Sequence, residues 1–424
     1  MMPRTAPSAM RIAILHYACP PVLGGVESIL STHARLLARA GHRPFLLAGR
    51  GEPRSVGLQG TILPELDSRH PDILRVQKAL LKEEDGAEQA FEEWVGRICT
   101  LLVAALGEAD ACIVHNAFTM HKNLALTVAL WRLVESGQGA RRWIAWCHDL
   151  AWANPLYDEE LCPRRPWTLL RTALPGVTYV AVSEQRRQEM AALFGVQAAS
   201  IEVVPNGVDP AVFLPTSADM LALQKEVRWA ERDWVFLAPV RITRRKNLEL
   251  GIEIMACLRD LGHRPLLLVT GPPGPHNVRS GEYLHELLAR RSALGLDGEV
   301  IFLAVEGGGG RGIQVSDALL DQLYWWCDAL LLTSTQEGFG LPIIEAGLVR
   351  LPIFCTDIPV LREVGGNHPV YFRPDDPPDR VAAVIVDTLS RSDVAAMRHR
   401  VLKTYSWDVV FQQGLMRVLT TAEG

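Results

Sequence analysis

The sequence lacks any long apolar run. No stretch reaches about 18 consecutive apolar residues, which is close to the length that a membrane-spanning helix needs. The first nine residues are polar and contain proline, and they do not form the apolar core of a secretory signal peptide. The sequence therefore predicts neither a transmembrane helix nor a secretory leader.

Paired cysteines are also missing. The eight cysteines are scattered along the chain, and none of them forms a Cys-x-x-Cys pair. This spacing indicates neither a zinc site nor a disulfide framework. Several cysteines fall inside apolar runs, as reduced thiols in the core of a cytosolic protein do. We therefore expect a cytoplasmic protein.

Strong net charge is absent as well. A net charge of −5 over 424 residues gives no reason to expect nucleic acid as a partner. The contents of 48% apolar and 21% charged residues are typical of a globular protein. A chain of 424 residues is too long for one ordinary core, so two or three domains are expected.

The most informative stretch is an apolar run followed by a glycine-containing turn. Residues 329–332 predict a buried parallel strand, and Pro342 suits the first turn of a following helix. Gly338 and Gly340 let the backbone come close to a ligand. The free N–H groups at the start of that helix would suit a phosphate.

Two carboxylates flank this turn. Glu337 follows the strand, and Glu345 lies eight residues later, inside the helix. Carboxylates only accept hydrogen bonds, so a pair of them beside an anion site suits a ligand that carries both phosphates and hydroxyls. A nucleotide sugar is such a ligand. A tight strand-to-helix turn with solvated glutamates is the plainer alternative.

These residues carry a family resemblance. The run Glu337-Gly338-Phe339-Gly340-Leu341-Pro342, together with Glu345, resembles the Glu-x7-Glu motif of retaining GT-B glycosyltransferases, specifically glycosyltransferase family 4, or group 1. The resemblance implies that the loop of Glu337, with Gly338, Phe339, Gly340 and Leu341, holds the donor sugar. It implies that Glu345 binds the ribose hydroxyls of the donor.

The first half of the chain reads as strand–loop–helix units. A strand at 11–16 precedes the loop that carries Gly24 and Gly25, and a helix follows from about Ser28 to Ala40. Apolar runs at 44–48, 111–114, 143–146, 178–182 and 202–204 predict further strands of the same sheet. Gly24 and Gly25 could serve only the turn geometry. The resemblance implies that their backbone faces the donor pyrophosphate and the acceptor.

Polar residues follow two neighbouring strands of this sheet. His148 ends one strand next to Asp149, and such a pair is more often structural than catalytic. The resemblance implies that His148 hydrogen-bonds the donor sugar. His115 and Asn116 end the preceding strand and are expected to point toward the cleft. Contact with the acceptor and a capping role for Asn116 both stay open.

A basic loop opens the second half. It carries Arg241, Arg244, Arg245 and Lys246, and it lies between a predicted strand at 234–240 and a predicted helix at 248–258. Four cations in six positions create a strong local positive field, and both side-chain types bind phosphate well. A solvated basic loop is the alternative. The resemblance implies that Arg241 and Lys246 hold the diphosphate, and that Gly271 after the next strand borders the donor.

The remaining elements of the second half are predicted from pattern alone. Residues 306–312 are expected to form a flexible loop, and 317–327 an amphipathic helix. Residues 351–356, 363–366 and 370–372 are expected to form strands and turns, and the chain from Pro378 onward is expected to be helical. Trp407 and Asp408 resemble the segment where the family's last helix returns to the first domain.

The predicted fold class is therefore α/β, a GT-B arrangement of two Rossmann-like doubly wound domains facing across a cleft. The predicted domains are an acceptor-binding domain at 1–218, a nucleotide-sugar-binding domain at 219–398, and a C-terminal helix at 399–424 that packs on the first domain. The expected reaction is retaining hexosyl transfer from a nucleoside diphosphate sugar, without a cofactor or metal. Arg241, Lys246 and the helix start at Gly340 would replace a metal's charge.

Two other readings stay open. One is a GT-B epimerase or phosphorylase, the latter needing a lysine-linked pyridoxal cofactor, and the other is a non-catalytic sugar-nucleotide-binding or membrane-associated scaffold. The acceptor of a transferase could be a small molecule, a glycan or a lipid. Arg35 and Arg39 on the first helix, with Arg43 just beyond, leave a peripheral membrane contact as an alternative to an ordinary surface helix.

Overall fold

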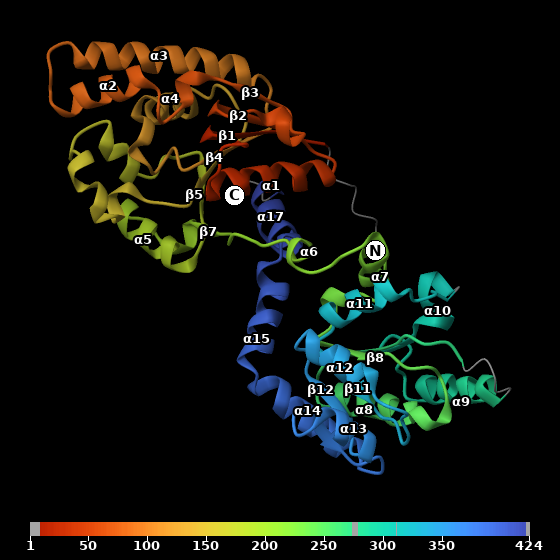
Figure 1. Ribbon diagram of the computed structural model, residues 1–424. Coiled ribbons are helices and arrows are strands. Elements are labelled where there is room, and N and C mark those ends of the chain that lie inside the picture. The colour runs from red at the N-terminus through yellow and green to blue at the C-terminus, as the bar shows by residue number, and fades with distance from the viewer. Residues whose placement is uncertain (1–8, 274–278, 311, 421–424) are drawn as a thin grey trace. The chain divides into compact units, whose positions relative to one another are not determined.

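The computed structural model describes residues 9–273, 279–310 and 312–420, and it divides into two compact units (Figure 1). Unit 1 comprises the chain up to Gly207 together with the segment from Trp407, and unit 2 is Val208–Ser406. The segment 214–223 contains Met220 and Leu223, which are buried in the core of unit 2. This segment is therefore part of unit 2.

Unit 1 is built on a seven-stranded parallel sheet with the order β3-β2-β1-β4-β5-β6-β7. All the strands predicted from apolar runs in this half are present, and the short β3 is an addition. The strands are β1 (Arg11–Ala18), β2 (Arg43–Arg50), β3 (Gly60–Ile62), β4 (Ala111–His115), β5 (Trp143–Cys147), β6 (Val177–Ala181) and β7 (Glu202–Val203).

Helices cover both faces of this sheet, as the alternation of side chains along β1 requires. Ile12 and Ile14 face one core, and Ala13 and Leu15 face the other. In Figure 1, α1 and α17 lie on one side of the strands, and α2, α3 and α4 lie on the other. The helices are α1 (Gly25–Arg39), α2 (Pro71–Leu81), α3 (Ala87–Leu106), α4 (Leu124–Glu135), α5 (Glu184–Phe194), α16 (Trp407–Val410) and α17 (Met416–Thr420).

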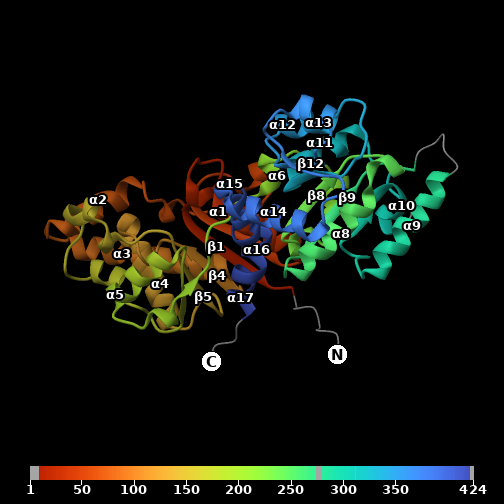
Figure 2. The same cartoon turned by 90° about the horizontal axis from the view of Figure 1, so that it is seen from below.

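Unit 2 repeats this plan with a six-stranded parallel sheet in the order β10-β9-β8-β11-β12-β13. Figure 2 shows α11, α12 and α13 together on one side of its strands, with α8 and α9 on the other. The strands are β8 (Trp234–Ala238), β9 (Pro265–Val269), β10 (Val300–Phe302), β11 (Ala329–Leu332), β12 (Ile353–Thr356) and β13 (Val370–Phe372). The helices are α6 (Pro210–Phe213), α7 (Ala218–Glu226), α8 (Leu248–Asp260), α9 (Arg279–Ala293), α10 (Leu303–Gly310), α11 (Asp317–Trp326), α12 (Leu341–Leu348), α13 (Pro359–Gly365), α14 (Pro378–Arg391) and α15 (Asp393–Arg400).

The strand order reverses at one point in each sheet. In unit 1 this point lies between β1 and β4, and in unit 2 it lies between β8 and β11. Ligands of open parallel sheets bind where the carboxyl ends of such strands separate. The basic loop follows β8 and the Glu-x7-Glu loop follows β11, so the fold brings both sequence motifs to one edge of unit 2. The predicted α/β class with two Rossmann-like units is confirmed.

Two local predictions were wrong. Residues 306–310 belong to helix α10 rather than to a flexible loop, and Arg311 lies outside the described residues. The Arg291 guanidinium holds the Glu306 carboxylate at 2.5 and 2.8 Å, so tertiary contacts override the poor helix propensity of a glycine run. Residues 363–365, expected among strands and turns, are the last turn of helix α13. The predicted turn at 274–277 lies outside the described residues.

Candidate active site

The four cations of the basic loop after β8 differ in exposure and in ion pairing. Lys246 is buried, whereas Arg241, Arg244 and Arg245 are exposed. Arg244 is already compensated, because it pairs with Glu286 at 2.6 Å and lies over the ring of Tyr283. Within the described part of the chain, the Arg241 side chain has no ion-pair or hydrogen-bond partner, so its guanidinium can bind an anion.

Lys246 and Glu337, which the sequence assigned to one site, are in direct contact. The Lys246 ammonium lies 2.5 Å from Oε1 of Glu337, and only 10% and 9% of the two side chains are exposed. The hydroxyl of Ser334 donates to the same carboxylate oxygen at 2.7 Å. Oε2 of Glu337 has no hydrogen bond to the residues that the structure describes, so one oxygen is free for a ligand.

Further hydrogen bonds join the two loops into one block. The Thr333 hydroxyl donates to the backbone carbonyl of Lys246 at 2.8 Å. The backbone N–H of Thr335 donates to the carbonyl of Arg245, also at 2.8 Å. The position of the basic loop relative to the carboxylates is therefore set by hydrogen bonds to its backbone as well as by the Lys246–Glu337 pair.

The start of α12 is open to an anion. Gly340 precedes the helix with φ of +97°, a conformation that favours glycine, and no side chain caps the first N–H groups. Phe339 and Leu341 are 54% and 59% exposed beside it. A Cβ on Gly338 would meet nothing within 4 Å, so packing within the described chain does not require glycine there.

Glu345 is held by a residue that the sequence reasoning missed. The hydroxyl of Tyr324, on α11, donates to Oε2 of Glu345 at 2.5 Å. Tyr324 is buried, and its hydrogen bond links α11 to α12. The sequence pattern marked Tyr324 only as one residue of an amphipathic helix and gave no signal for this contact.

Gly271 supports the basic loop from β9. A Cβ at this position would lie 2.4 Å from the carbonyl oxygen of Val240 and 2.7 Å from Cα of Arg241. The backbone N–H of Gly271 donates to that same carbonyl at 3.1 Å. Glycine is needed here because the backbone that carries Arg241 passes this close.

In unit 1 the glycine loop is the N-terminal end of α1. The helix begins at Gly25, three residues earlier than predicted, and Gly24 precedes it in an extended conformation. A Cβ on Gly24 would meet only the movable carboxylate of Glu27, and one on Gly25 would meet nothing within 4 Å. Neither glycine is required by a left-handed backbone, so their predicted role toward the donor stays a prediction.

His148 lies in a cluster of four histidines at the carboxyl ends of the strands. Nε2 of His148 is 3.0 Å from Nδ1 of His115, and the two ring planes are only 14° apart, as an edge-to-edge hydrogen bond requires. His115 is completely buried, so the expectation that it points toward the cleft was wrong. Nδ1 of His16 lies 3.1 Å from the carbonyl of His115, and the ring of His33 packs against His115 from α1. The sequence reasoning missed His16 and His33 as neighbours of His148.

Asn116 supports the turn after the neighbouring strand and does not cap a helix, since the next helical segment begins at His121. Its side-chain oxygen accepts the backbone N–H groups of His148 at 2.8 Å and Asp149 at 3.2 Å. Asn116 itself has φ of +62°, which asparagine tolerates better than most residues. The turn that carries His148 is therefore fixed by the neighbouring strand end.

Burial keeps this histidine cluster neutral. Desolvation, aided by the neighbouring His16, lowers the pKa of His148 to about 3. Desolvation and the neighbouring His148 lower the pKa of His33 to about 3 as well. The pKa of His115 also lies well below its usual range, mainly through burial. At neutral pH these rings can form hydrogen bonds but carry no charge.

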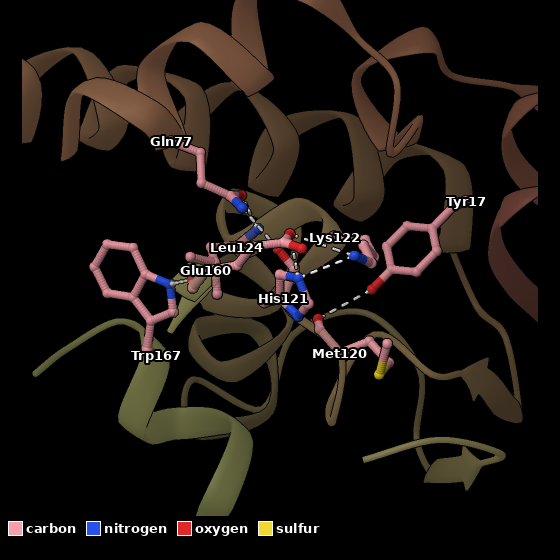
Figure 3. A network of polar contacts seen from close by, with 8 residues as sticks. All are labelled: Tyr17, Gln77, Met120, His121, Lys122, Leu124, Glu160 and Trp167. Atoms are coloured by element: carbon pink, nitrogen blue, oxygen red, sulfur yellow. Dashed lines mark hydrogen bonds and ion pairs between the residues drawn. The ribbon is translucent and has the colours of Figure 1, made fainter. Parts of the chain in front are cut away.

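A second polar network braces the loop that follows β4 (Figure 3). His121 is buried and contacts the Glu160 carboxylate at 2.7 Å, while Lys122 lies 3.4 Å from the same oxygen. The hydroxyl of Tyr17 donates to the carbonyl of Met120 at 3.2 Å. The figure shows these side chains converging on one short segment, which is thereby held against β1 and the chain after β5.

The predicted site residues thus form two groups. Unit 1 holds Gly24, Gly25 and His148, and unit 2 holds Arg241, Lys246, Gly271, Glu337, Gly338, Phe339, Gly340, Leu341 and Glu345. Among the described residues, no three His, Cys, Asp or Glu side chains are grouped to hold a metal ion. In the same residues, every helix is too short or too polar to span a membrane.

Two family models match the chain in succession. The model described as Glycosyltransferase Family 4 matches residues 23–212, and that of Glycosyl transferases group 1 matches residues 219–400. The second match contains the basic loop and both glutamates. The chain belongs to the family 4, group 1 glycosyltransferases. This glycosyltransferase is a nucleotide-sugar-dependent enzyme with the GT-B fold.

Named relatives of this glycosyltransferase differ in how much they share with it. It is 24% identical over 382 residues to the mannosylglucosylglycerate synthase of Thermotoga maritima, which covers 83% of this chain and 82% of that protein. It is 28% identical over 268 residues to the O-antigen chain mannosyltransferase RfbU of Salmonella typhimurium, covering 62% and 61%. The serotype-specific mannosyltransferase WbdA of Escherichia coli is 44% identical over 70 residues, only 16% of this chain and 9% of that protein.

Among solved structures, Anabaena Alr3699/HepE in complex with UDP and glucose is similar to this glycosyltransferase. The sequence identity is 17%, the TM-score is 0.36, and the match covers 97% of this chain and 100% of that chain.

Proposed function

We propose that this glycosyltransferase moves a hexosyl group from a nucleoside diphosphate sugar to an acceptor hydroxyl with retention of the anomeric configuration, and that it needs no metal ion. The observation that supports this proposal is the single block formed by Lys246, Glu337 and the uncapped start of α12. It offers cationic and amide donors to a diphosphate, and a free carboxylate oxygen to sugar hydroxyls.

The reaction requires stabilisation of the negative charge that develops on the departing diphosphate. As the bond from the anomeric carbon to the diphosphate oxygen breaks, negative charge grows on that oxygen. The Arg241 guanidinium, the Lys246 ammonium and the free backbone N–H of Leu341 at the start of α12 are fixed donors for that charge. Such preorganised donors can replace the Lewis acid role of a metal ion.

Retention follows if the acceptor attacks the face that the diphosphate leaves. The acceptor oxygen bonds to the anomeric carbon, and its proton passes to the departing diphosphate oxygen. No enzyme nucleophile is then needed. Glu337 and Glu345 act here as hydrogen-bond acceptors for the hexose and the ribose, not as the acid/base pair of a hydrolase.

The hexose to test first is mannose. The names of the Thermotoga maritima, Salmonella typhimurium and Escherichia coli relatives all refer to mannosyl transfer or a mannosylated product. The acceptor is a small molecule, a glycan or a lipid that supplies one hydroxyl. A thermal-shift screen of GDP-mannose, UDP-glucose, UDP-galactose and ADP-glucose identifies the donor, because a ligand that binds only the folded state raises the Tm.

The transfer experiment then uses that donor in excess EDTA over a panel of acceptors. We expect a product whose anomeric configuration, measured by the one-bond carbon–hydrogen coupling in NMR, equals that of the donor. An inverted product contradicts retention. Loss of turnover in EDTA that Mn²⁺ or Mg²⁺ restores contradicts metal independence.

Lys246→Ala tests whether the Lys246 ammonium stabilises the departing diphosphate. Removing one fixed donor to the leaving charge typically costs about 100-fold or more in kcat, and we expect a loss of that size. Arg244→Ala is the matched control, because the Arg244 cation is already paired with Glu286 and should change kcat little. Near-normal turnover of Lys246→Ala would remove the proposed role.

A further inference from the structure

Three buried rings beside His148 leave polar nitrogens without partners. The rings of His33, His115 and Trp146 are mutual neighbours, with centroids 4.7 to 6.1 Å apart. Both ring nitrogens of His33, Nε2 of His115 and Nε1 of Trp146 are buried and have no hydrogen-bond partner among the described residues. The position of the proton in the His115–His148 pair decides whether Nε2 of His115 is one more buried donor or an acceptor.

Two arrangements are open to the 3.0 Å contact between Nδ1 of His115 and Nε2 of His148. In the first, His115 donates through Nδ1–H and its Nε2 carries a lone pair. In the second, His148 donates through Nε2–H, and Nε2–H of His115 becomes a buried donor. Each neutral imidazole has one N–H and one lone pair, so the choice changes the balance of donors and acceptors in the interior.

The number of buried N–H groups without an acceptor favours the first arrangement. The Trp146 indole always contributes one N–H, and the neutral His33 contributes one N–H and one lone pair. With a lone pair on His115 Nε2, two of the four unpartnered nitrogens are donors and two are acceptors. With a proton there, three are donors and one is an acceptor. Buried donors without acceptors are costly, at about 1–3 kcal/mol each from desolvation.

We propose that His115 is a positioning residue that donates from Nδ1 to His148 and thereby fixes His148 as a neutral imidazole with its proton on Nδ1. Asn116 completes the positioning, because it holds the backbone N–H groups of His148 and Asp149. Nδ1 of His148 has no partner within the described part of the chain and lies on a side chain that is 8% exposed. It is the ring nitrogen left for a ligand.

The chemical consequence is that His148 can give a hydrogen bond but cannot take a proton as a base. This step rests on the proposed transfer reaction and on the contact between His148 and the donor sugar that the family resemblance implies, whereas the tautomer itself does not. The groups that face the pair are His16 from β1 and His33 from α1, and Glu27 acts on His16. Burial lowers the pKa of His16, His33 and His148, which agrees with neutral rings throughout.

Long-range ¹H–¹⁵N spectra of the full chain labelled with ¹⁵N-histidine read the tautomers directly, without any substrate. His148→Gln and His115→Asn assign the two rings by loss of their signals. We expect His148 protonated on Nδ1 and unprotonated on Nε2, unchanged between pH 6 and 8. A proton on Nε2 of His148 overturns the proposal, whether or not the enzyme transfers a sugar.

Variants of His115 separate positioning from mere packing. His115→Leu removes the donor, and we expect His148 to populate both tautomers and kcat to fall by about threefold to tenfold, the worth of one hydrogen bond. His115→Asn places an amide N–H at the Nδ1 position and should restore the wild-type His148 spectrum and part of kcat.

His121→Leu is the matched control, because it removes another fully buried histidine from the loop after the same strand (Figure 3). It should lower the Tm while leaving the His148 spectrum and kcat unchanged. An unchanged His148 spectrum in His115→Leu, or equal effects of His115→Leu and His121→Leu on that spectrum, would show that His115 only fills space. Failure of the proposed function would appear separately, as absence of transfer by the wild-type enzyme.

Discussion

At the scale of single residues, Lys246 stands out because it is a nearly buried cation. Glu337 is its counter-ion, at 2.5 Å. Taking two charges out of water is costly, and removing one partner leaves the other charge uncompensated. The pair therefore keeps Lys246 charged and in place before the donor arrives, and a diphosphate can then share or replace the carboxylate as counter-ion.

Glu337→Gln tests this description of the pair. We expect the free energy of unfolding to fall by about 3 kcal/mol, because the Lys246 charge loses its partner. A nucleoside diphosphate should raise the Tm of this variant more than that of the wild type, since phosphate restores the missing negative charge. Differential scanning fluorimetry with and without the nucleotide measures both effects. Equal Tm shifts in the two proteins would show that the phosphates bind elsewhere.

Gly338 and Gly271 are glycines for different reasons: Gly338 is proposed to leave space for a ligand, and Gly271 allows close packing of the chain. A Cβ at Gly338 meets nothing in the chain, so Gly338→Ala should change the Tm by less than about 1 °C while weakening donor binding tenfold or more, if the donor fills that space. Gly271→Ala should destabilise the fold, because its Cβ would lie 2.4 Å from the Val240 carbonyl. Calorimetric titration with the donor, together with Tm, distinguishes them. Full donor affinity in Gly338→Ala would place the donor away from this loop.

At the scale of elements, a hydrogen bond joins α11 to α12 at Glu345, the carboxylate proposed to bind the donor's ribose. Tyr324 on α11 fixes one oxygen of Glu345 on α12 and leaves the other without a partner among the described residues. We expect Tyr324→Phe to weaken binding of the nucleoside diphosphate about tenfold, since a hydrogen bond to a charged group is worth about 1.5–3 kcal/mol. Titration calorimetry with the nucleotide and its 2′- and 3′-deoxyribose analogues measures this. If the variant loses as much affinity for the deoxy analogues as for the parent nucleotide, Tyr324 does not act through contact of Glu345 with the ribose hydroxyls.

An element can be predicted from the sequence when its local residue pattern stabilises it, and not when a contact distant in sequence does. The strand at 329–332 was predicted with its observed bounds, because a fully buried parallel strand is a continuous apolar run between polar residues. The helix at 303–310 was not, because its glycines disfavour a helix and the contact of Glu306 with Arg291 on another helix is invisible to local pattern. The apolar run at 111–114 placed His115 at the end of a strand, yet it could not show that the ring turns inward onto His148.

At the scale of the whole molecule, the buried histidines of unit 1 make stability depend on pH. Burial lowers the pKa of His33 and His148 to about 3 and also lowers those of His16 and His115, against about 6.5 in the unfolded chain. Below pH 6.5 the unfolded state therefore binds more protons than the folded state. Stability is complete above that pH and falls as the pH drops through it, by up to about 1.4 kcal/mol per pH unit for each histidine.

We therefore expect a markedly lower free energy of unfolding at pH 5.5 than at pH 7.5, measured by urea titration. Carboxylates with lowered pKa, such as Asp233 and Asp357, lose their contribution only at more acid pH. His33→Phe should reduce the pH slope by about one proton, because it removes one of the buried rings. Equal stabilities of the wild type at the two pH values would mean that these rings are not buried in solution.

Two sheets of the same plan carry different chemistry at their strand ends: neutral rings in unit 1, and charged pairs with free amides in unit 2. The central claim is that the charged edge of unit 2 grips the diphosphate of the donor. The most direct test is a crystal structure of the enzyme with its nucleoside diphosphate. The account predicts phosphate oxygens within hydrogen-bond distance of Arg241, Lys246 and the free N–H at the start of α12, with the ribose at Glu345. A nucleotide bound with its phosphates away from these groups would contradict it.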